Sequence, residues 1–421
     1  MLITYRIFSI LTYPLLFIFT LLRIIKKKEN LRSFFEKLLV SGSNDNNYAI
    51  WFHGASIGEV RSIFPIVKKI LEKKNDIQIL ITSTTLTSAK VIEVEFKNEK
   101  KVTHKFLPYD IHFLANTFIR KYNPQLAIFI DSEIWPNFMI SLKNKSIPVL
   151  LLNARISERS FKRWKKISQT ASKIFSYFDL IVSSNKNTFE NLKTFSIKNV
   201  QYLGNLKLLD LNSLKIDSKI KKIDFKNKRV WLAASTHPNE EKLIIAAHLI
   251  ISKQVKDLMT IIVPRHINRI NLIEKLIDKK LIKYQIINNT NEIDLESDMI
   301  LINAVGTLNE FYNSCKTVFI GKSFEHNLSY NSGQNPIEPL KFGCNITHGP
   351  YVKNFEEIYD LLNKTKLATK VTSVEQLVKE VMVSINKNIV CDQNELLLLK
   401  QKAKTFENKI MILLDKYLDA I

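Results

Sequence analysis

Short apolar runs, each followed by a turn and an amphipathic stretch, constrain the fold of this chain more than any other feature. A first series lies in the amino-terminal half, at residues 49–52, 77–81, 126–130, 149–152 and 180–182. A second series follows, at residues 230–233, 259–263, 284–287, 299–302 and 318–320. Runs of this length are typical of buried parallel strands, and the stretches between them have helical periodicity. Each series therefore predicts its own α/β sheet.

The length of the chain also favours two domains. Its 421 residues exceed what one hydrophobic core usually holds, and 46% hydrophobic residues are sufficient for two cores. The polar, weakly periodic stretch from Leu211 to Lys228 is predicted to link them. We predict Rossmann-like domains over 29–212 and 213–393, with a terminal helix over 394–421 that packs back toward the first domain. Open sheets of this class bind ligands at the carboxyl ends of their strands, so we expect a cleft there.

The amino terminus carries a membrane signal within residues 1–28. An uncharged, mainly apolar run from Ile7 to Leu22 lies between Arg6 and the basic flank formed by Arg23 and residues 26–28. Its length as a helix is about 24 Å, short of the roughly 30 Å hydrocarbon core, so spanning and shallow insertion both remain open. No small-residue cleavage site follows, which disfavours a signal peptide. The flanking charges predict a membrane anchor helix with the domains in the cytoplasm.

The charge balance points to an anionic partner. Lys and Arg number 62 against 40 Asp and Glu, which gives a net charge of +22. Nucleic acid, an anionic lipid surface or a phosphorylated substrate would each fit, while many of these lysines are equally explained as solvated charge on helix faces. The three cysteines, Cys315, Cys344 and Cys391, are too far apart to suggest a disulfide framework or a zinc site. The eight histidines form no helical ligand pair, so we expect no metal.

The turn after the first strand holds the first candidate for chemistry. His53 ends the strand, and Gly54, Ser56 and Gly58 precede Glu59 in the first turn of a helix. A carboxylate in this place stabilises a helix through its free N–H groups, and position alone favours that interpretation. The company of a histidine, a serine and two glycines beside a predicted cleft favours a second one. Glu59 could then act as a general base that takes a proton from an acceptor hydroxyl.

A second acidic turn follows the strand at 126–130. Asp131 and Glu133 are spaced two apart, so they would repel each other on one face of a continuing strand, and we expect the chain to turn here. Glu133 is our choice for the site. Trp135 is interpreted as a packing residue or as a wall of an acceptor site.

Three later segments offer hydrogen-bond donors and positive charge after apolar strands in the second half of the chain. A single one could be a solvated turn, but three together suit a phosphate group, with an arginine able to make bidentate contacts. Gly321, after the last strand of the second series, could allow close backbone approach to a ligand, although turns favour glycine in any case. The candidate residues are Gly204, Asn205, Lys207, Ser235, Thr236, Arg265, His266 and Gly321.

The segment from Asn335 to Pro339 reads as a helix start. Asn335 is a cap residue, Pro336 suits the first helical position, and Glu338 is an acid in the first turn. That alone explains the segment structurally. Functionally, Glu338 could accept hydrogen bonds from the vicinal hydroxyls of a nucleotide ribose, and the helix start favours a nearby phosphate.

Taken in order, these segments resemble the Kdo transferases of Gram-negative bacteria, where Kdo is 3-deoxy-D-manno-octulosonic acid. The resemblance runs through nearly the whole chain. It rests on HGASIGEV at 53–60, DSEIWPN at 131–137, LLNARIS at 151–157, YLGNLK at 202–207, AASTHPNEE at 233–241, VPRH at 263–266, NPIEP at 335–339 and HGPYVKNF at 348–355.

The resemblance implies a GT-B glycosyltransferase that inverts the anomeric centre without a metal or cofactor. It transfers Kdo from CMP-Kdo to the lipid A precursor, lipid IVA or Kdo-lipid IVA, beside an anionic membrane surface, with no nucleic-acid partner. By the same similarity Glu59 is the catalytic base and Arg155 supports the acceptor site. Glu338 is the ribose ligand, and the CMP-sugar pocket is lined by Lys207, Ser235, Arg265 and Asn335.

Two departures and two rivals accompany this interpretation. The family usually has a glutamate where this chain has Thr307, and a histidine where it has Gln334, which cannot titrate.

One rival is a GT-B transferase that uses a UDP-sugar and another lipid-linked acceptor. The other is a non-catalytic binder of nucleotide or nucleic acid, which the absence of the usual glycine-rich phosphate motifs disfavours.

Overall fold

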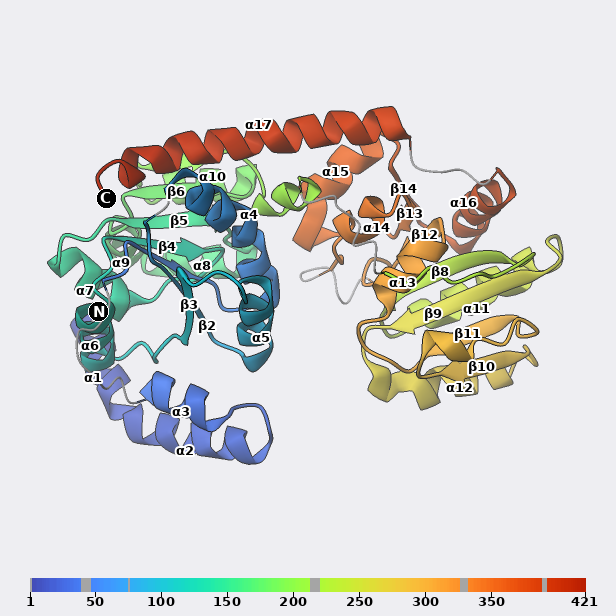
Figure 1. Cartoon of the computed structure of the whole chain (residues 1–421), viewed down its shortest axis with the longest axis horizontal. Helices are drawn as coiled ribbons and strands as arrows, with labels where there is room; N and C mark the ends of the chain where they lie inside the picture. Colours follow the sequence, from blue (N-terminus) through green and yellow to red (C-terminus); the bar gives the residue numbers. More distant parts are fainter. Residues whose placement is uncertain (1, 39–46, 75, 213–219, 326–331, 388–391) are drawn as a thin grey trace. The chain divides into compact units, whose positions relative to one another are not determined.

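The computed structural model describes residues 2–38, 47–74, 76–212, 220–325, 332–387 and 392–421. The chain forms two compact units (Figure 1). Unit 1 comprises Met1–Asp210 together with Lys404–Ile421, and unit 2 comprises Leu211–Ala403. Of the predicted linker over 211–228, residues 213–219 lie outside the described residues.

Unit 1 is built on a sheet of seven parallel strands in the order β3-β2-β1-β4-β5-β6-β7. The strands are β1 Ile50–His53, β2 Ile79–Ser83, β3 Val102–Phe106, β4 Leu126–Ile130, β5 Val149–Ala154, β6 Leu180–Ser183 and β7 Val200–Tyr202. Its helices are α1 Leu2–Leu11, α2 Tyr13–Ile25, α3 Leu31–Leu38, α4 Ile57–Lys73, α5 Leu86–Glu95, α6 His112–Tyr122, α7 Pro136–Asn144, α8 Glu158–Lys166, α9 Ser168–Phe175, α10 Lys186–Lys193 and the 3-10 helix η1 Leu206–Leu211.

Two hydrophobic cores cover the two faces of this sheet, because successive strand residues point to opposite sides. Ile50 and Phe52 of β1 join the core that includes α4, α5 and the end of α17 (Gln393–Leu418). Trp51, between them in sequence, joins the other core with residues of α6, α7 and α9. All three side chains are fully buried. The central strands are therefore apolar on both faces, which is why they stand out in the sequence.

Unit 2 repeats the plan with seven parallel strands in the order β10-β11-β9-β8-β12-β13-β14. The strands are β8 Arg229–Thr236, β9 Leu258–Pro264, β10 Tyr284–Ile287, β11 Met299–Ile302, β12 Thr317–Ile320, β13 Asn345–His348 and β14 Ala368–Lys370. Its helices are α11 Glu240–Ile251, α12 Ile270–Asp278, α13 Leu308–Ser314, α14 Ile337–Lys341, α15 Glu356–Lys364, α16 Val374–Lys387 and the first part of α17. Short 3-10 helices are η2 Ile267–Arg269, η3 Thr290–Glu292 and η5 Lys353–Phe355.

The strand order reverses once in each sheet. In unit 1 the chain proceeds outward from β1 to β3 and then returns to β4, which lies beside β1. In unit 2 the reversal falls between β8 and β12. At such a switch point the loops after neighbouring strands diverge, which opens a crevice at the carboxyl ends of the strands. The predicted acidic turns follow β1 and β4, and the predicted phosphate-binding segments after β8 and β12 flank the second reversal.

The ten strands expected from the sequence are present, and four others were missed. The missed strands are β3, β7, β13 and β14. Of these, β3, β7 and β14 lie at sheet edges and are only partly buried. Polar residues on the solvated side interrupt their apolar pattern, and β7 and β14 have three residues each. Strand β13 has Ile346 as its single apolar residue although most of the strand is buried.

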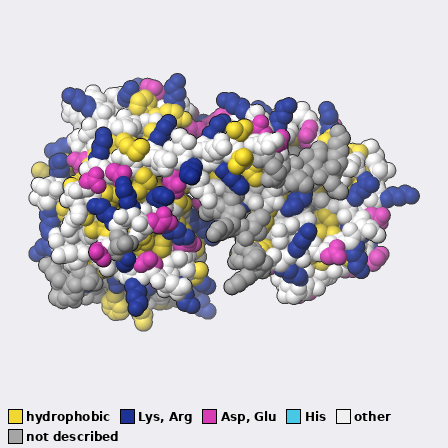
Figure 2. Space-filling view, turned by 45° about the horizontal axis from the view of Figure 1, so that its top comes forward, with side chains coloured by type: hydrophobic (Ala, Val, Ile, Leu, Met, Phe, Trp, Pro, Cys, Tyr) yellow, Lys and Arg dark blue, Asp and Glu magenta, His cyan; other side chains and the backbone are white. Residues whose placement is uncertain are grey.

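The amino-terminal run forms two helices instead of the expected single one. Helix α1 ends at Leu11 and α2 begins at Tyr13, with a bend of 52° between them. Among the described residues no single helix has the length and apolar content to cross a bilayer, whereas this bent pair meets both criteria when taken together. Figure 2 shows Lys and Arg side chains distributed over the visible surface with acidic side chains among them. Much of the positive charge is thus solvated surface charge.

Candidate functional site

Glu59 closes a capping box at the start of α4. The Ser56 hydroxyl accepts a hydrogen bond from the Glu59 backbone N–H and donates one to Glu59 Oε1 at 2.7 Å. Glu59 Oε2 accepts the Ala55 N–H at 2.6 Å. The turn is tight, since a Cβ on Gly54 would lie 3.1 Å from Glu59 Cβ. The stabilising interpretation of Glu59 is therefore correct as far as it goes.

The surroundings of Glu59 also keep its carboxylate ready to accept a proton. Burial, together with repulsion from Asp131 and Glu133, raises the pKa of Glu59 to about 7, although the hydrogen bonds from Ser56 and Ala55 oppose this. An acid with a pKa near the working pH is both substantially ionised and basic enough to take a proton. A carboxylate that served only as a helix cap would have no need of two further acids beside it.

Glu133 is held by a tryptophan of its own turn and by the histidine that ends β1. It accepts hydrogen bonds from the Trp135 ring N–H at 2.9 Å and from His53 Nε2 at 3.2 Å. The other ring nitrogen, Nδ1, lies 2.9 Å from the Thr82 hydroxyl, which also accepts from Trp51 Nε1. His53 is fully buried, so these contacts fix the orientation of its ring and the position of Glu133.

Asp131 lies at the centre of a second polar network. Both Asp131 and Asn153 adopt the left-handed backbone conformation, with φ of 58° each, and the Asn153 amide donates to Asp131. Asn153 Oδ1 accepts the Leu206 N–H at 2.9 Å, which ties the segment before Lys207 to the ends of β4 and β5. Burial raises the pKa of Asp131, and the charges of Lys207 and Arg155 oppose that rise. Burial lowers the pKa of Lys207, against the attraction of Asp131 and Glu59.

The structure corrects the grouping of one predicted segment. Gly204, Asn205 and Lys207 were placed with the phosphate-binding segments of the second half, but they belong to unit 1. Gly204 has a φ of 120°, a conformation that favours glycine, and Asn205 Oδ1 accepts the Lys207 N–H at 3.0 Å. Lys207 thus lies among the acids of unit 1. Strand β7, which the sequence did not reveal, leads to the segment that carries Lys207.

In unit 2 the segments after β8 and β9 lie side by side. Ser235 has a φ of 55°, which turns the chain sharply, and the Arg265 N–H donates to the Thr236 carbonyl at 3.0 Å. The rings of His237 and His266 are 5.8 Å apart in an edge-to-face arrangement. Burial lowers the pKa of His237 to about 4, so its ring is neutral near pH 7. Arg265 and His266 are exposed to solvent, where an anion could reach them.

Two buried acids, which the sequence did not single out, organise these loops. Glu240 accepts backbone N–H groups from both the β8 and the β12 loops at 2.7 to 3.0 Å, and burial raises its pKa. Glu241 accepts the Thr236 hydroxyl and a bidentate pair of bonds from Arg269. Two glutamates in the first turn of a helix read as ordinary dipole-stabilising residues, so only the fold reveals this role. The donors to Glu240 are His237, Lys322, Ser323 and Phe324.

Gly321 is required by packing between the same loops. A Cβ at this position would lie 2.6 Å from the Ser235 carbonyl oxygen and 2.7 Å from Thr236 Cα. Both are backbone atoms, which cannot move aside cheaply. The close approach found at Gly321 is to the end of β8, and the predicted approach to a ligand stays a prediction.

The segment around Glu338 starts a helix slightly later than expected. Helix α14 begins at Ile337, and Asn335 Oδ1 accepts the Ile337 N–H at 3.1 Å. Glu338 is half-buried, and its charge adds to burial in raising the pKa of Tyr312. Gln334, which stands where the family usually has a histidine, is contacted through its backbone. The Tyr359 hydroxyl donates to the Gln334 carbonyl at 3.0 Å.

At the other departure, the Thr307 hydroxyl is buried without a hydrogen-bond partner among the described residues. No group of three or more His, Cys, Asp and Glu side chains suited to a metal occurs in the described part of the chain.

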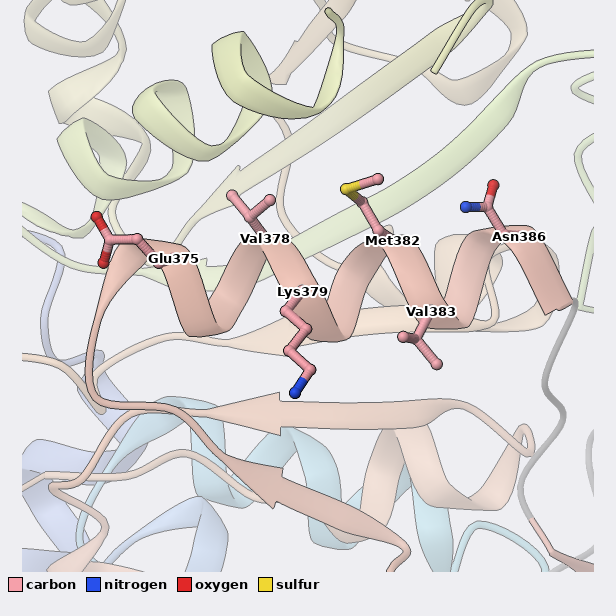
Figure 3. Close-up of a pocket in the computed structure, with 6 residues that line it drawn as sticks. All are labelled: Glu375, Val378, Lys379, Met382, Val383 and Asn386. Atoms are coloured by element: carbon pink, nitrogen blue, oxygen red, sulfur yellow. The ribbon is translucent and has the colours of Figure 1, made fainter. Parts of the chain in front are cut away.

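A surface hollow of about 460 Å³ runs along α16, between Glu375 and Asn386 (Figure 3). All residues that line it come from that one helix, and none is a predicted site residue. The candidate site therefore consists of the strand-end clusters.

Comparison with solved structures defines the class. A putative UDP-N-acetylglucosamine 2-epimerase from Listeria monocytogenes matches with a TM-score of 0.59 at 14% identity, covering 89% of this chain and 98% of that chain. A glycosyltransferase from Rickettsia africae ESF-5 matches with a TM-score of 0.57 at 14% identity, covering 88% and 99%. At these identities the likeness concerns the fold. The chain thus has two parallel-sheet α/β domains of the GT-B type.

Sequence comparison defines the family. The model of the family described as 3-deoxy-D-manno-octulosonic-acid transferase (kdotransferase) matches residues 29–209. A 3-deoxy-D-manno-octulosonic acid transferase of Haemophilus influenzae is 30% identical over 334 residues, 77% of this chain and 76% of the relative. Another from Rickettsia bellii is 29% identical over 421 residues, 99% and 98% of the two chains. The chain belongs to the Kdo transferase family, as its motifs had indicated.

Proposed function

We propose that this Kdo transferase moves Kdo from CMP-Kdo to lipid IVA, or to Kdo-lipid IVA, in lipopolysaccharide core synthesis. Glu59 would serve as general base in an inverting displacement, on the cytoplasmic side of the inner membrane. The observation that carries the proposal is the Glu59 carboxylate, whose pKa is raised to about 7 beside Asp131 and Glu133 at the β1–β4 switch point. We infer the transferred sugar from the family and the general base from the surroundings of Glu59.

The proposed reaction forms one bond and breaks one. The acceptor hydroxyl oxygen attacks the anomeric carbon of Kdo while its proton passes to Glu59. The bond from that carbon to the phosphate oxygen breaks, and CMP leaves with the electron pair. Attack opposite to the leaving group inverts the anomeric centre. A base with a pKa near 7 can accept the proton as the hydroxyl becomes acidic in the transition state.

The growing negative charge on the leaving phosphate needs fixed positive charge and hydrogen-bond donors. In the proposal Arg265 provides a guanidinium group at the end of β9, and the β8 loop provides Ser235 and Thr236. Asn335 and Glu338 would hold the ribose and the rest of CMP. Preorganised groups of this kind commonly contribute several kcal/mol to a transition state. The proposal assigns this work to residues of the chain and includes no metal.

In unit 1, Lys207 and Arg155 have a different part. Both act electrostatically on Asp131, and Lys207 also interacts with Glu59. We propose that they keep the acidic cluster partly ionised and orient the acceptor or the departing anion. His53 would hold Glu133. Ser56 and Gly58 would border the acceptor, because the Ser56 hydroxyl binds the Glu59 carboxylate and Gly58 precedes Glu59 in the chain.

The experiment that tests the base is Glu59→Gln in a purified transfer assay with CMP-Kdo and lipid IVA. We expect turnover to fall by roughly a hundredfold or more while CMP binding is retained, since general-base contributions are typically about 10²–10⁴. Glu158→Gln is the matched control, because Glu158 is an exposed acid in the first turn of another unit 1 helix. Near-normal turnover of the Glu59→Gln variant would contradict the assignment of Glu59 as the general base.

A further inference from the structure

Helices α1 and α2 bury polar residues and expose apolar ones, the reverse of a helix pair in water. Their buried residues are polar, namely Ser9 in α1 and Thr20 in α2. Their large apolar side chains point outward, with Phe8 65% and Leu15 66% exposed. A helix on a soluble domain buries its apolar stripe and exposes polar groups. The reversed pattern is the one expected where protein lies on one side and hydrocarbon on the other.

The polar side of the pair is bound to the folded part of unit 1. The Tyr5 hydroxyl donates to Asp110 at 2.8 Å, and the Thr20 hydroxyl shares a hydrogen bond with the neighbouring Tyr109 hydroxyl at 2.8 Å. Tyr13, next to the bend, donates to the Leu38 carbonyl at 2.9 Å. Contacts to unit 1 thus occur along both helices and at their junction. A segment that left the domain to cross a bilayer would lose these contacts.

Most of the exposed large apolar side chains among the described residues of unit 1 belong to this pair. Such a concentration on one element marks an interaction surface. The outward apolar residues are Ile3, Ile7, Phe8, Ile10, Leu11, Leu15, Phe17, Ile18, Phe19, Leu21, Leu22 and Ile25.

The surface around the pair is basic, which indicates the kind of membrane. A hollow of about 300 Å³ on α6 is lined by His112, Phe113, Asn116, Thr117, Arg120 and Lys145. The Phe113 ring packs on Tyr13 at 5.2 Å, so the hollow adjoins the helix pair. Arg6 lies near His112, and its Nε and Nη2 are buried without hydrogen-bond partners among the described residues. The cations exposed at this hollow, Arg120 and Lys145, lie where phosphate groups of anionic lipids could contact them.

We propose that α1 and α2 insert together into one leaflet of an anionic bilayer, lying in the plane of the membrane while they stay bound to unit 1. Residues 26–28 continue the basic border at the end of α2. The proposed function gives this mode of attachment its use, because a lipid acceptor would then meet the enzyme from the same leaflet. Insertion itself is measured without any transfer reaction, so the two proposals can fail separately.

A topology experiment separates one-leaflet insertion from a span. Full-length protein receives an amino-terminal extension that carries a single cysteine, and in a second version Ser157→Cys marks the exposed surface of unit 1. The native cysteines, Cys315, Cys344 and Cys391, are changed to serine in both. A membrane-impermeant maleimide is applied to spheroplasts and to inverted membrane vesicles. We expect both cysteines to react from the same side, and reaction from opposite sides overturns the proposal.

A vesicle-binding experiment tests the apolar face. The triple variant Phe8→Gln, Leu15→Gln, Ile18→Gln should bind anionic vesicles at least about tenfold more weakly, because three large side chains no longer enter hydrocarbon. The matched control, Val94→Gln, Leu272→Gln, Leu281→Gln, changes three exposed apolar residues elsewhere and should bind as the unmodified chain does. The proposal is overturned if the Phe8, Leu15, Ile18 variant binds vesicles as the unmodified chain does. It is also overturned if that variant loses self-association and keeps its vesicle binding.

The anionic headgroup is tested by lipid composition. Vesicles of phosphatidylglycerol with phosphatidylethanolamine should bind more protein than vesicles of phosphatidylcholine alone. Arg120→Gln with Lys145→Gln should remove most of that preference and leave the weaker binding to neutral vesicles unchanged. If the double variant retains the full preference, the basic hollow has no part in attachment, and the proposed headgroup contact is wrong.

Discussion

At Glu59 one carboxylate closes a capping box and repels two neighbouring acids. The hydrogen bonds from Ser56 and Ala55 stabilise its charged form, and burial with Asp131 and Glu133 destabilises it. The second group of effects is larger, because the pKa rises to about 7. The residue is therefore held with its charge only partly compensated, which suits proton transfer more than helix stabilisation.

This balance predicts a pH profile. As the pH falls through about 7, Glu59 takes up a proton, and kcat/KM for CMP-Kdo should fall about tenfold per pH unit below that midpoint. Glu133→Gln removes one repelling charge, so the midpoint should move to lower pH, whereas Glu158→Gln should leave it in place. A rate that does not change between pH 5 and pH 8 would contradict this role for Glu59.

The same balance predicts an effect on stability. The folded pKa of about 7 lies above the ordinary value of 4.5, so stability falls as the pH rises from 4.5 to 7, and the cost is complete above 7. Glu59→Gln should thus raise the free energy of unfolding at pH 8 by about 1 kcal/mol, after allowance for solvent screening. In thermal melts this is about 2–4 °C, with a smaller gain at pH 5. A lower Tm at both pH values would show that the capping role dominates.

Individual side chains were predicted unevenly from the sequence. Glu59, His53 and Glu133 follow strands that are apolar and easily recognised, and the structure brings them together at one sheet edge. Thr82 and Asn153 escaped notice because their roles depend on partners from other elements, 29 and 53 residues away in sequence. Pairings across strands leave no local pattern, so only the assembled sheet shows them.

At the scale of elements, the ends of β8 and β12 form one rigid support in unit 2. Glu240 binds the loops of both strands, and Gly321 packs directly on the Ser235 carbonyl. Gly321→Ala should lower the free energy of unfolding of unit 2 by about 1–3 kcal/mol, the usual cost of overpacking, and should weaken stabilisation by CMP. Thermal melts with and without CMP check both effects, and an unchanged melt would contradict the packing argument.

Gly58 offers a matched test with the opposite sign. A Cβ there meets no atom within 4 Å, and the residue lies in the first turn of α4. Gly58→Ala should therefore stabilise the protein by about 0.4–1 kcal/mol, mainly by restricting the unfolded chain. The thermal melt of this variant checks the prediction. A loss of stability would reveal strain that the free space around Gly58 does not suggest.

The elements themselves were mostly predictable. Central strands are buried on both faces, so their apolar runs are continuous, and β4 and β11 have the bounds that were expected. The edge strand β10 also has its expected bounds, although most of it is only partly buried. Edge strands such as β3 alternate with polar residues and did not stand out. Missing β7 had a consequence, because its loop carries Lys207 to the acids of unit 1. The bend between α1 and α2 was missed as well, because the apolar run is continuous, although Pro14 in the first turn of α2 marks the break.

For the whole molecule, the nucleotide distinguishes the proposed donor from its rival. A ligand that binds the folded state at a hundred times its Kd stabilises it by about 2.7 kcal/mol. CMP should therefore raise the melting temperature of the full chain, and UDP at the same concentration should not. Stabilisation by UDP alone would favour a transferase that uses a UDP-sugar and another lipid-linked acceptor.

The central claim is that this member of the Kdo transferase family uses Glu59 to transfer Kdo to a lipid A precursor. Mass spectrometry of lipid IVA, after incubation with CMP-Kdo and the purified chain, tests donor, acceptor and base together. We predict a product heavier by one or more Kdo residues with the native chain, and unmodified lipid IVA with Glu59→Gln. Unmodified lipid with the native chain, or equal product from Glu59→Gln, would contradict the account.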